Sequence, residues 1–254
     1  MSDPSDVLDV LKALGFRAGK DSLRALLEQM TKARSSPMET CEKLVGLERR
    51  ERDSHNLARR TRLATLGSFK ALDAFDWNHP KSIDRALYEE LHGMDFLERC
   101  ENVLFRGQSG VGKTMLAQNL GLAALEKGHT VRFTTLAGAL ADLLRQESLP
   151  AFERRLRRYV RPELLIIDEL GYVPCDSRSA DLLYNIISRR HERASTVITT
   201  NLAFKHWGTV FPGAACVAAL VDRFAQHLRV VDVDAESWRQ NKNEPAPQKP
   251  KRKR

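Results

Sequence analysis

Long apolar segments are missing from this 254-residue chain, and cysteine is scarce. No run approaches the roughly 18–20 residues that a membrane-spanning helix needs. The first residues, MSDPSDVLDV, carry acids where a secretory signal carries basic side chains. The four cysteines lie far apart and form no C-x-x-C pair, which leaves little support for a zinc ribbon or a disulfide framework. We therefore expect a cytoplasmic protein with reduced thiols and without a membrane segment.

Positive charge is in excess, and most of the excess lies at the C-terminal end. The net charge is +8, and residues 239–254 hold seven basic side chains against one acid. Their Pro- and Lys/Arg-rich composition predicts a disordered basic tail. Such a tail either adds sequence-independent attraction to DNA or only keeps the end of the chain soluble.

Two arginine clusters lie in the rest of the chain. Residues 49–62 contain six arginines and two acids, and residues 153–161 contain five arginines and one acid. Most of these arginines are three to four residues apart, so each cluster forms one face of a helix. A single cluster is ordinarily a solvated face, but two clusters and a tail together favour nucleic acid as the partner. The candidate DNA-binding residues are Arg49, Arg50, Arg59, Arg60, Arg154, Arg155 and Arg158.

The order of hydrophobic patterns predicts three regions. Helical spacing over 7–34 and 38–66 indicates a small all-helical domain at 1–66, and 67–80 is typical of a linker. The segment 67–238 then alternates short apolar runs with helical stretches, which indicates βαβ units and a parallel sheet. The expected strands are 102–106, 130–135, 164–168, 195–200 and 228–233. The expected helices are 113–126, 137–147, 150–160, 179–193 and 214–226. Residues 239–254 form the tail.

A glycine-rich loop between the first strand and the first helix of this region matches G-x-x-x-x-G-K-[ST] without mismatch. Glycines let backbone N–H groups turn inward around an anion, and the following helix N-terminus adds positive potential. Lys113 is expected to reach the β- and γ-phosphates of ATP, and the Thr114 hydroxyl to bind Mg²⁺. The predicted nucleotide-binding residues are Gly107, Gln108, Ser109, Gly110, Val111, Gly112, Lys113, Thr114 and Met115.

Two acids end the apolar run 164–168. This buried strand is expected beside the strand that precedes the loop, where Asp168 would join the magnesium ligands and Glu169 would polarise an attacking water. A pair of carboxylates there favours hydrolysis over a small-molecule kinase, which has no water to activate. Asn201, at the end of the strand 195–200, is expected to hydrogen-bond the γ-phosphate or that water. Core packing is the favoured role for Trp77 and Trp207.

The segments GQSGVGKT, LLIIDELGYVP, ISRRHE, STVITTN, FKHWGTVF and ALVDRF occur in this order over about residues 75–235. Together they resemble the IstB/DnaC-like branch of AAA+ ATPases, and most closely the IstB helper ATPases of insertion-sequence transposases. The resemblance implies a P-loop NTPase fold of the ASCE type, with a parallel sheet flanked by helices. It also implies a bacterial, DNA-associated homo-oligomer with ATP sites between subunits, acting on duplex DNA and an IstA-like transposase.

The resemblance also implies an arginine finger donated by the neighbouring subunit. Asp222-Arg223-Phe224 occupies the position of the family's finger motif, so Arg223 is the favoured candidate. The alternative for Arg223 is a surface arginine paired with Asp222. Arg189 and Arg190 are the reserve candidates and could equally line a DNA channel. Few residues follow the last strand, so the helical lid of a full AAA+ module is expected to be truncated, which leaves the adenine contacts open.

Other functions remain open at this point. A DnaC-type replicative helicase loader shares the same ATPase motifs, but no aromatic-rich stretch of the kind that stacks on single strands is apparent, which favours duplex DNA. A non-catalytic basic DNA-bridging protein is disfavoured by the intact carboxylate pair. A small-molecule kinase is disfavoured because no substrate-binding lid is apparent.

Overall fold

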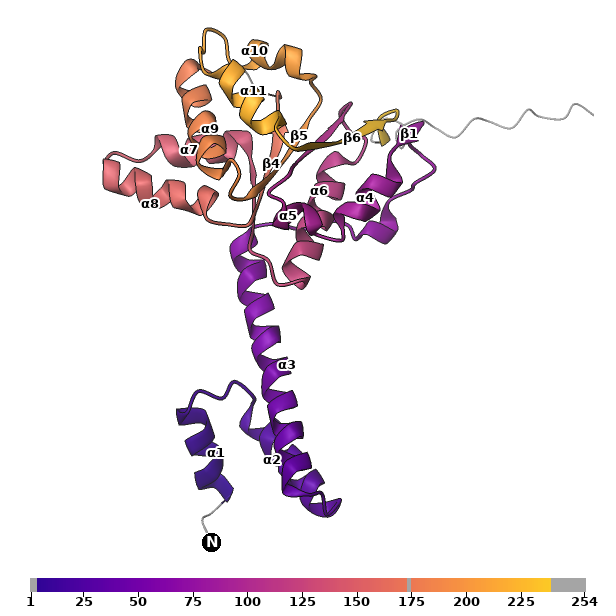
Figure 1. Cartoon of the computed structure of the whole chain (residues 1–254), viewed down its shortest axis with the longest axis vertical. Coiled ribbons are helices and arrows are strands. Elements are labelled where there is room, and N and C mark those ends of the chain that lie inside the picture. The colour runs from indigo at the N-terminus through magenta and orange to yellow at the C-terminus, as the bar shows by residue number, and fades with distance from the viewer. Residues whose placement is uncertain (1–3, 173–174, 239–254) are drawn as a thin grey trace, which may run out of the picture. The chain divides into compact units, whose positions relative to one another are not determined.

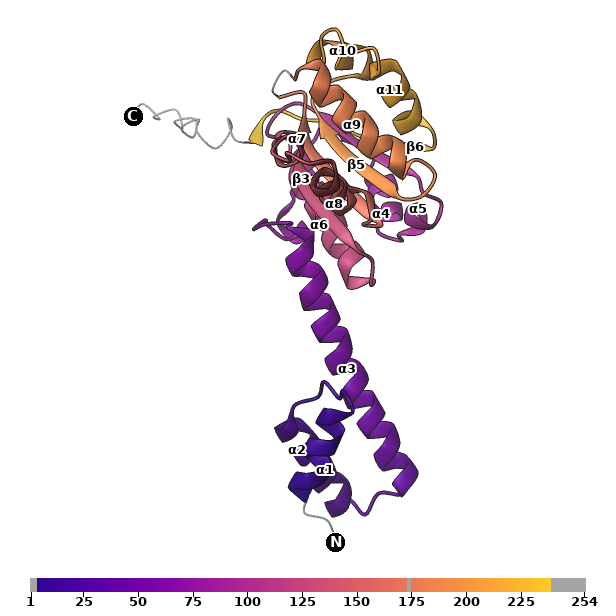
Figure 2. The same ribbon diagram turned by 90° about the vertical axis from the view of Figure 1, so that its left-hand side faces the viewer.

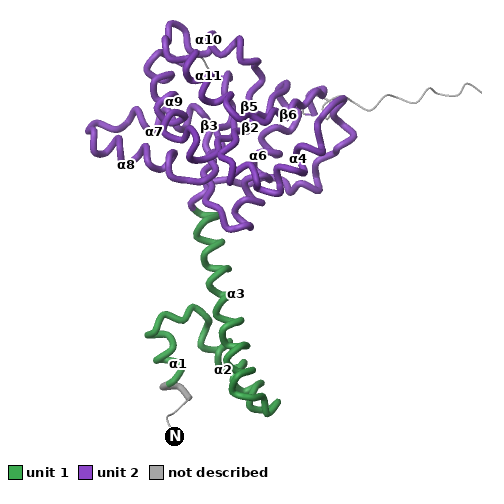
Figure 3. Tube along the Cα trace, viewed as in Figure 1, with its two compact units in different colours: residues 1–62 green, residues 63–254 purple. Residues whose placement is uncertain are grey.

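The computed structural model describes residues 4–172 and 175–238, so the basic tail expected at 239–254 lies outside the described residues. The chain divides into two compact units, residues 1–62 and 63–254 (Figure 3). This division falls close to the domain boundary expected at residue 66. Of the helices in the described ranges, none is long and apolar enough to cross a membrane.

The first unit is entirely helical, as its hydrophobic spacing predicts. It contains α1 (Pro4–Ala13), α2 (Lys20–Lys32) and most of α3 (Pro37–Ala64), which continues past the boundary (Figure 1). Its core is small: Leu8, Ala18 and Leu23 are buried, and a few partly buried side chains of the three helices pack around them. A core of this size buries little apolar surface, so polar contacts matter more for holding the helices together.

A buried carboxylate supplies such a contact. Glu48 on α3 is 8% exposed and accepts hydrogen bonds from the backbone N–H groups of Arg17 and Ala18, at 2.8 and 3.0 Å, and from Arg52 Nε at 2.5 Å. Burial by itself raises the pKa of Glu48, but the N–H groups of Ala18 and Arg17 and the Arg52 guanidinium outweigh it and hold the pKa below its usual value. Glu48 therefore fastens the α1–α2 connection to α3.

The second unit is built on a six-stranded sheet with the order β1-β6-β2-β5-β4-β3. All five strands expected from the sequence are present, and their neighbouring pairs are parallel. β1, which the sequence did not indicate, pairs antiparallel with β6 at one edge. The strand bounds are β1 (Ser82–Ile83), β2 (Asn102–Gly107), β3 (Val131–Thr135), β4 (Leu164–Leu170), β5 (Ser195–Thr200) and β6 (Leu228–Asp234).

The expected neighbour of the strand that carries Asp168 is wrong. The sequence predicts that the strand with Asp168, β4, is the direct neighbour of β2, the strand before the glycine loop. In the structure β5 lies between β2 and β4 and is hydrogen-bonded to both. Buried parallel strands are all short apolar runs, so their composition does not reveal which of them are neighbours. The consequence for the site is that Thr199, near the end of β5, lies beside Asp168 and contacts it.

Alternation along the central strands distributes their side chains over two helical layers (Figures 1 and 2). Leu165 and Ile167 of β4 face a core shared with the helices after β3, whereas Ile166 faces α6 at Gly121. Tyr88 of α4 packs on the same side as α6, and its hydroxyl donates to the Leu116 carbonyl at 3.0 Å. The helices are α4 (Arg85–Leu91), α5 (Asp95–Glu98), α6 (Lys113–Glu126), α7 (Leu136–Leu144), α8 (Leu149–Val160), α9 (Ser177–Arg190), α10 (Trp207–Val210) and α11 (Val217–Ala225), with 3-10 turns η1 (Leu72–Ala74) and η2 (Phe204–His206).

The two tryptophans assigned to packing differ in burial. Trp207 is 0% exposed and stacks on Phe224 with ring centroids 5.9 Å apart, which confirms its place in the core. Trp77 is half-buried and contacts the rings of Phe75 and Tyr88 at 4.8 and 5.5 Å. Both are therefore packing residues.

Candidate active site

The glycine loop connects the end of β2 to the start of α6, and two of its glycines are required by close approaches. A Cβ on Gly107 would lie 2.2 Å from the Val233 carbonyl oxygen of the neighbouring strand β6. Gly112, the N-cap of α6, has φ +97°, and a Cβ there would lie 2.7 Å from the Phe75 ring. Only glycine fits both positions without displacing its neighbours, so the path of the loop depends on these two residues.

Lys113, the first residue of α6, is held inside this loop. It is 5% exposed, and its Nζ donates to the carbonyl oxygens of Gly107 at 2.8 Å and Gln108 at 2.7 Å. An ammonium group held inside the glycine loop, at a helix N-terminus, creates positive potential suited to a polyphosphate. This is the position that the motif predicts for Lys113.

Thr114 and Asp168 form a compact pair of oxygen donors. The Thr114 hydroxyl lies 3.0 and 3.1 Å from the two carboxylate oxygens of Asp168, which is 3% exposed. The Thr199 hydroxyl also donates to Asp168, and the backbone N–H of Glu169 donates to that same Thr199 oxygen at 3.1 Å. A buried carboxylate beside a hydroxyl is a donor set that Mg²⁺ accepts, completed by phosphate oxygens and water. The residues present therefore fit the expected metal.

Glu169 is turned toward the cavity by a local irregularity in β4. Its φ is +64°, and the register between β4 and β5 shifts between Ile167 and Leu170. A shift of this kind re-aims one side chain of a strand. The Glu169 side chain is consequently exposed and lines the same cavity as Lys113 and Thr114, whereas Asp168 stays buried.

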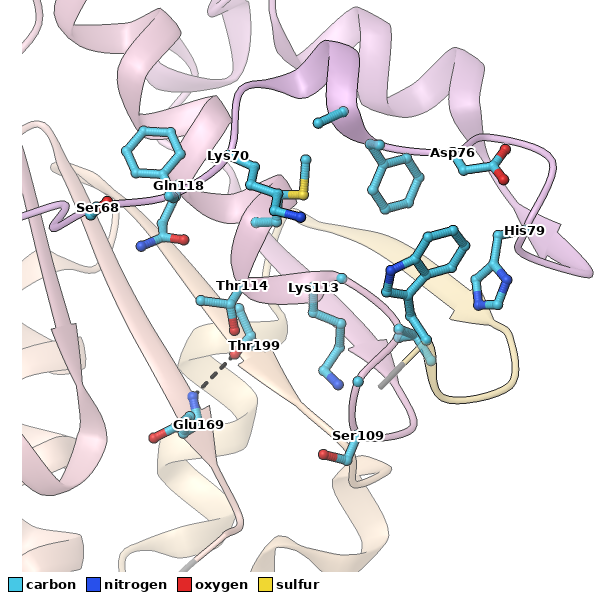
Figure 4. Close-up of a pocket in the computed structure, with 18 of the residues that line it drawn as sticks. Ser68, Lys70, Asp76, His79, Ser109, Lys113, Thr114, Gln118, Glu169 and Thr199 are labelled. Atoms are coloured by element: carbon cyan, nitrogen blue, oxygen red, sulfur yellow. Dashed lines mark hydrogen bonds between the residues drawn. The ribbon is translucent and has the colours of Figure 1, made fainter. Parts of the chain in front are cut away.

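A cavity of about 390 Å³ extends from the glycine loop (Figure 4). Figure 4 shows Lys113 and Thr114 in its middle, Glu169 and Thr199 on one side, and Asp76 and His79 on another. The side with Asp76 and His79 is aromatic, since Phe75 precedes Asp76 in the chain and the Trp238 ring contacts His79. Phe69 lines the cavity as well. The residues of this side come from the expected linker and from the segment after the last strand, where the sequence carries no motif.

The segment after β6 is fixed over the loop. The backbone N–H of Trp238 donates to the Gly110 carbonyl at 3.2 Å, and a Cβ on Gly110 would lie 2.4 Å from Ser237 Oγ. The Trp238 ring stands edge-on to His79 with centroids 4.7 Å apart, and His79 Nε2 hydrogen-bonds the Glu236 carbonyl at 2.9 Å. This segment is thus packed against both the glycine loop and His79.

Asn201 lies just beyond β5 and is exposed. Its Oδ1 would be 3.3 Å from a Cβ on Gly171, so the side chain lies beside the turn that follows Glu169. It is not among the residues that line the cavity, whereas Thr199, two residues earlier, is. The role of Asn201 at the γ-phosphate therefore stays a prediction. Thr199 lines the cavity instead, and in the sequence it is only one polar residue of the strand end.

The three candidate finger arginines differ sharply in their surroundings. The Arg223 guanidinium lies over the Tyr184 ring, 5.0 Å from its centroid, and no carboxylate in the described residues forms an ion pair with it. Arg189 forms a two-point ion pair with Glu153, at 2.7 Å for both bonds. Arg190 is 1% exposed and donates only to groups of the protein interior, so its expected role as finger or DNA contact is wrong.

The remaining candidate DNA-binding arginines lie on two separate surfaces. In the first unit, Arg49, Arg50 and Arg59 are exposed and Arg60 is half-buried. An open cavity of about 590 Å³ there is lined by Arg17, Arg52, His55, Asn56, Ala58, Arg59 and Arg62. In the second unit, a cavity of about 230 Å³ is lined by Gln146, Ala151, Arg154, Arg155 and Arg158. Arg155 is partly engaged there by an ion pair with Asp142 at 3.2 Å.

A glycine loop after β2, a buried aspartate and an exposed glutamate at the end of β4, and a parallel sheet with β5 between them define a P-loop ATPase of the AAA+ class. Solved structures with the same fold include DnaI, with TM-score 0.53 and 15% identity over 66% of this chain and 89% of that one. AMPPCP-bound DnaA from Aquifex aeolicus has TM-score 0.55 and 14% identity over 67% of this chain and 51% of that one.

The chain belongs to the family of IstB-like ATP binding proteins, whose model matches residues 10–246. A relative from Pseudomonas aeruginosa, described as an insertion sequence IS21 putative ATP-binding protein, is 35% identical over 217 residues, which cover 85% of this chain and 82% of the relative. The IS232 putative ATP-binding protein of Bacillus thuringiensis subsp. berliner is 36% identical over 202 residues, covering 80% and 81%. These comparisons confirm the resemblance that the motifs indicated.

Proposed function

We propose that this protein is a transposition helper of an insertion sequence, which assembles on duplex DNA with ATP and recruits and stimulates a transposase. The observation that carries the proposal is the joint presence of a cavity lined by Lys113, Thr114 and Glu169 and of two arginine-lined surfaces in a chain of the IstB-like family. ATP brings copies of the chain together around the duplex. The assembly selects or deforms the target DNA, and hydrolysis releases it.

The nucleotide lies along the cavity from Glu169 to Trp238 in this proposal. The glycine loop and Lys113 hold the phosphates, and Thr114 with Asp168 holds Mg²⁺, whose positive charge when bound polarises the phosphate oxygens. The aromatic end receives the adenine, because flat apolar rings bind a base by stacking. Residues 236–238, which contact the glycine loop and His79, cover the base in this arrangement.

Hydrolysis uses two groups that approach the γ-phosphate from different subunits. Glu169 accepts hydrogen bonds from the attacking water and orients it, since its carboxylate is exposed to the cavity. Arg223 of the neighbouring copy neutralises the charge that develops on the transferred phosphoryl group. An arginine donated across the interface makes turnover depend on assembly, and so on DNA.

Two substitutions separate ATP binding from turnover. Lys113→Ala is expected to lose ATP binding, measured with a fluorescent ATP analogue, because the loop then lacks its only ammonium group aimed inward. Glu169→Gln is expected to bind ATP but not hydrolyse it, and to form longer-lived DNA complexes. Lys205→Ala, at an exposed lysine, is the matched control. Normal ATP affinity of Lys113→Ala, or unchanged turnover of Glu169→Gln, contradicts the assigned roles.

The trans arrangement has its own test. Arg223→Ala is expected to bind ATP normally and to lose hydrolysis. Mixing it with Glu169→Gln, which keeps an intact Arg223, creates interfaces with a complete site and restores turnover. An arginine that acts within its own subunit shows no such rescue.

DNA contact by the second unit is tested on α8. The double substitution Arg154→Ala with Arg158→Ala is expected to weaken duplex binding and to reduce the slope of log affinity against log salt by about 2, since each duplex phosphate contact contributes about 0.9. The matched control removes the same charge at Arg157 and Arg161, which do not line the cavity. Equal losses in the two double variants mean that only net charge matters.

The second candidate function, a replicative helicase loader acting on single-stranded DNA, uses the same ATPase core. Stronger ATP-dependent binding to single strands than to duplex favours it. Binding that does not depend on nucleotide indicates a basic DNA-bridging protein.

A further inference from the structure

Arg223 and Tyr184 form the one close contact that reaches the Arg223 guanidinium in the described part of the chain. The guanidinium carbon lies 5.0 Å from the centroid of the Tyr184 ring. Arg223 is in the last turn of α11 and Tyr184 is in the middle of α9, so the contact joins two neighbouring helices of the same layer (Figure 1). Both side chains are half-buried, which leaves one side of the pair open to an approaching molecule.

A guanidinium stacked on a ring keeps its N–H donors available, whereas one paired with a carboxylate does not. Cation–π contact uses the flat face of the group, whereas its five N–H donors point outward in the plane. Arg189 and Arg190 show the opposite arrangement. The N–H groups of Arg189 donate to the Glu153 carboxylate, and those of Arg190 donate to backbone carbonyls. Among these three arginines, Arg223 alone is both held in place and able to donate to a phosphate.

The stacking partner is itself fixed. Tyr184 packs against the core cluster below α9, next to the fully buried Leu183. Cys216, the N-cap of α11, and Val217 and Val221 of that helix pack against the same cluster. Phe224, which follows Arg223, is 0% exposed and stacks on Trp207. Both ends of the contact therefore belong to rigid elements, and the long arginine side chain is the only flexible part between them.

We propose that Tyr184 is a positioning residue, which holds Arg223 extended from the α9–α11 surface so that its N–H groups can meet the γ-phosphate of ATP bound to a neighbouring copy. The inference rests on the proposed function, because it takes Arg223 as the finger. An unrestrained arginine loses considerable rotamer freedom when it binds a phosphate. The ring removes that freedom before the subunits meet, and it does so without consuming a donor.

The expected effect follows from the strength of a partly exposed cation–π contact. Tyr184→Leu is expected to lower kcat for ATP by about two- to fivefold, which corresponds to about 0.5–1 kcal/mol at 1.4 kcal/mol per tenfold, with ATP affinity unchanged within twofold. Tyr184→Phe keeps the ring and is expected to retain wild-type kcat. Leu182→Ala, at another half-buried α9 residue packed on the same core, controls for loosened packing and is expected to leave kcat unchanged.

A double-substitution cycle separates positioning from a structural role. In an Arg223→Ala background, the small residual turnover is followed with radiolabelled ATP at high protein concentration. Tyr184→Leu is expected to cause no further loss of this residual turnover, because the group that it positions is gone. A loss of the same factor in both backgrounds overturns the inference. So does an equal loss in Tyr184→Phe, which retains the stacking surface.

Mixing gives the second readout. Glu169→Gln subunits keep both Tyr184 and Arg223 intact, so adding them to Tyr184→Leu is expected to raise turnover per hydrolysing site toward the wild-type value. No rise means that Tyr184 serves its own subunit, which overturns the inference. If Arg223→Ala alone hydrolyses ATP at the wild-type rate, the finger assignment and this inference fall together. If Arg223→Ala is inactive while Tyr184→Leu is unchanged, only this inference falls.

Discussion

Arg190 is a charged residue whose removal should damage the fold rather than the chemistry. It is 1% exposed, and its guanidinium makes six hydrogen bonds without a carboxylate partner. The acceptors are the carbonyl oxygens of Tyr159, Val160, Pro162, Glu163 and Ser195 and the Thr196 hydroxyl. Burial lowers the pKa of Arg190 to about 9, which is still above neutral pH, so the group stays charged.

These bonds join three parts of the second unit: the end of α8, the entry to β4 and the start of β5. The perturbation is Arg190→Met, which keeps much of the apolar volume and removes every donor. Six charge-assisted bonds cannot simply be summed, because relieving the burial of the charge offsets part of their loss. Removing the guanidinium leaves buried carbonyl oxygens without a donor, at about 1–3 kcal/mol for each one that stays unsatisfied. With the offset from the relieved charge burial, we expect a net loss of about 3–5 kcal/mol. At about 2–4 °C per kcal/mol for a unit of this size, Tm should fall by about 6–20 °C.

The assay is thermal unfolding followed by tryptophan fluorescence. All three tryptophans, Trp77, Trp207 and Trp238, lie beyond residue 62, so the signal reports the second unit alone. The matched control is Arg189→Met, which breaks a surface ion pair whose side chains are 40% and 32% exposed, and which should cost about 0–1 kcal/mol. A Tm of Arg190→Met within about 3 °C of wild type, or an equal fall in both variants, refutes the reasoning.

Three further predictions concern the loop, the aromatic end and the first unit. Gly112→Ala should lower ATP affinity at least about tenfold in titrations with a fluorescent ATP analogue, because φ +97° is strained for alanine and the new Cβ meets Phe75. Gly208→Ala is the control and should leave this affinity unchanged, since a Cβ there meets nothing within 4 Å. Trp238→Ala should raise KM for ATP about tenfold with little change in kcat, if base stacking contributes about 1–3 kcal/mol; an unchanged KM removes Trp238 from the base site. Glu48→Gln should destabilise the first unit by about 1–2 kcal/mol, seen as lost protection of α1–α2 amides in hydrogen exchange. Because the folded pKa of Glu48 is depressed, its contribution is present above about pH 4.5 and is lost as pH falls below its folded pKa, so the wild-type protection should then approach that of the variant.

The phosphate-binding half of the site could be predicted from sequence because it depends on local chain geometry. The glycine loop, Lys113 and Thr114 are contiguous, and their roles follow from a strand before them and a helix after them. Asp168 was found in the same way, as an acid at the end of a buried strand. The order of the strands could not be predicted, because it depends on contacts between residues distant in sequence. The position of β5 between β2 and β4, and with it the contact of Thr199 with Asp168, was therefore missed.

The other half of the site is made by residues distant in sequence. Phe75 and Trp238 meet the loop only because the segments before β1 and after β6 both return to it, and neither segment has a periodic pattern. The adjacent arginines Arg189 and Arg190 show the same limit. On α9, Arg189 pairs with Glu153 at the surface, whereas Arg190 is buried in the core. Both residues are arginines, so the sequence gives no indication of this difference.

The central claim is that ATP assembles this chain on duplex DNA, and complex size on DNA tests it most directly. Duplex and single-stranded DNA of equal length are each mixed with the protein and ATP, a slowly hydrolysed ATP analogue or ADP, and the mass of the complexes is measured. The account predicts large complexes on duplex DNA with ATP or its analogue and their loss with ADP. Equal complexes in all three nucleotide states, or large complexes on single strands alone, contradict it.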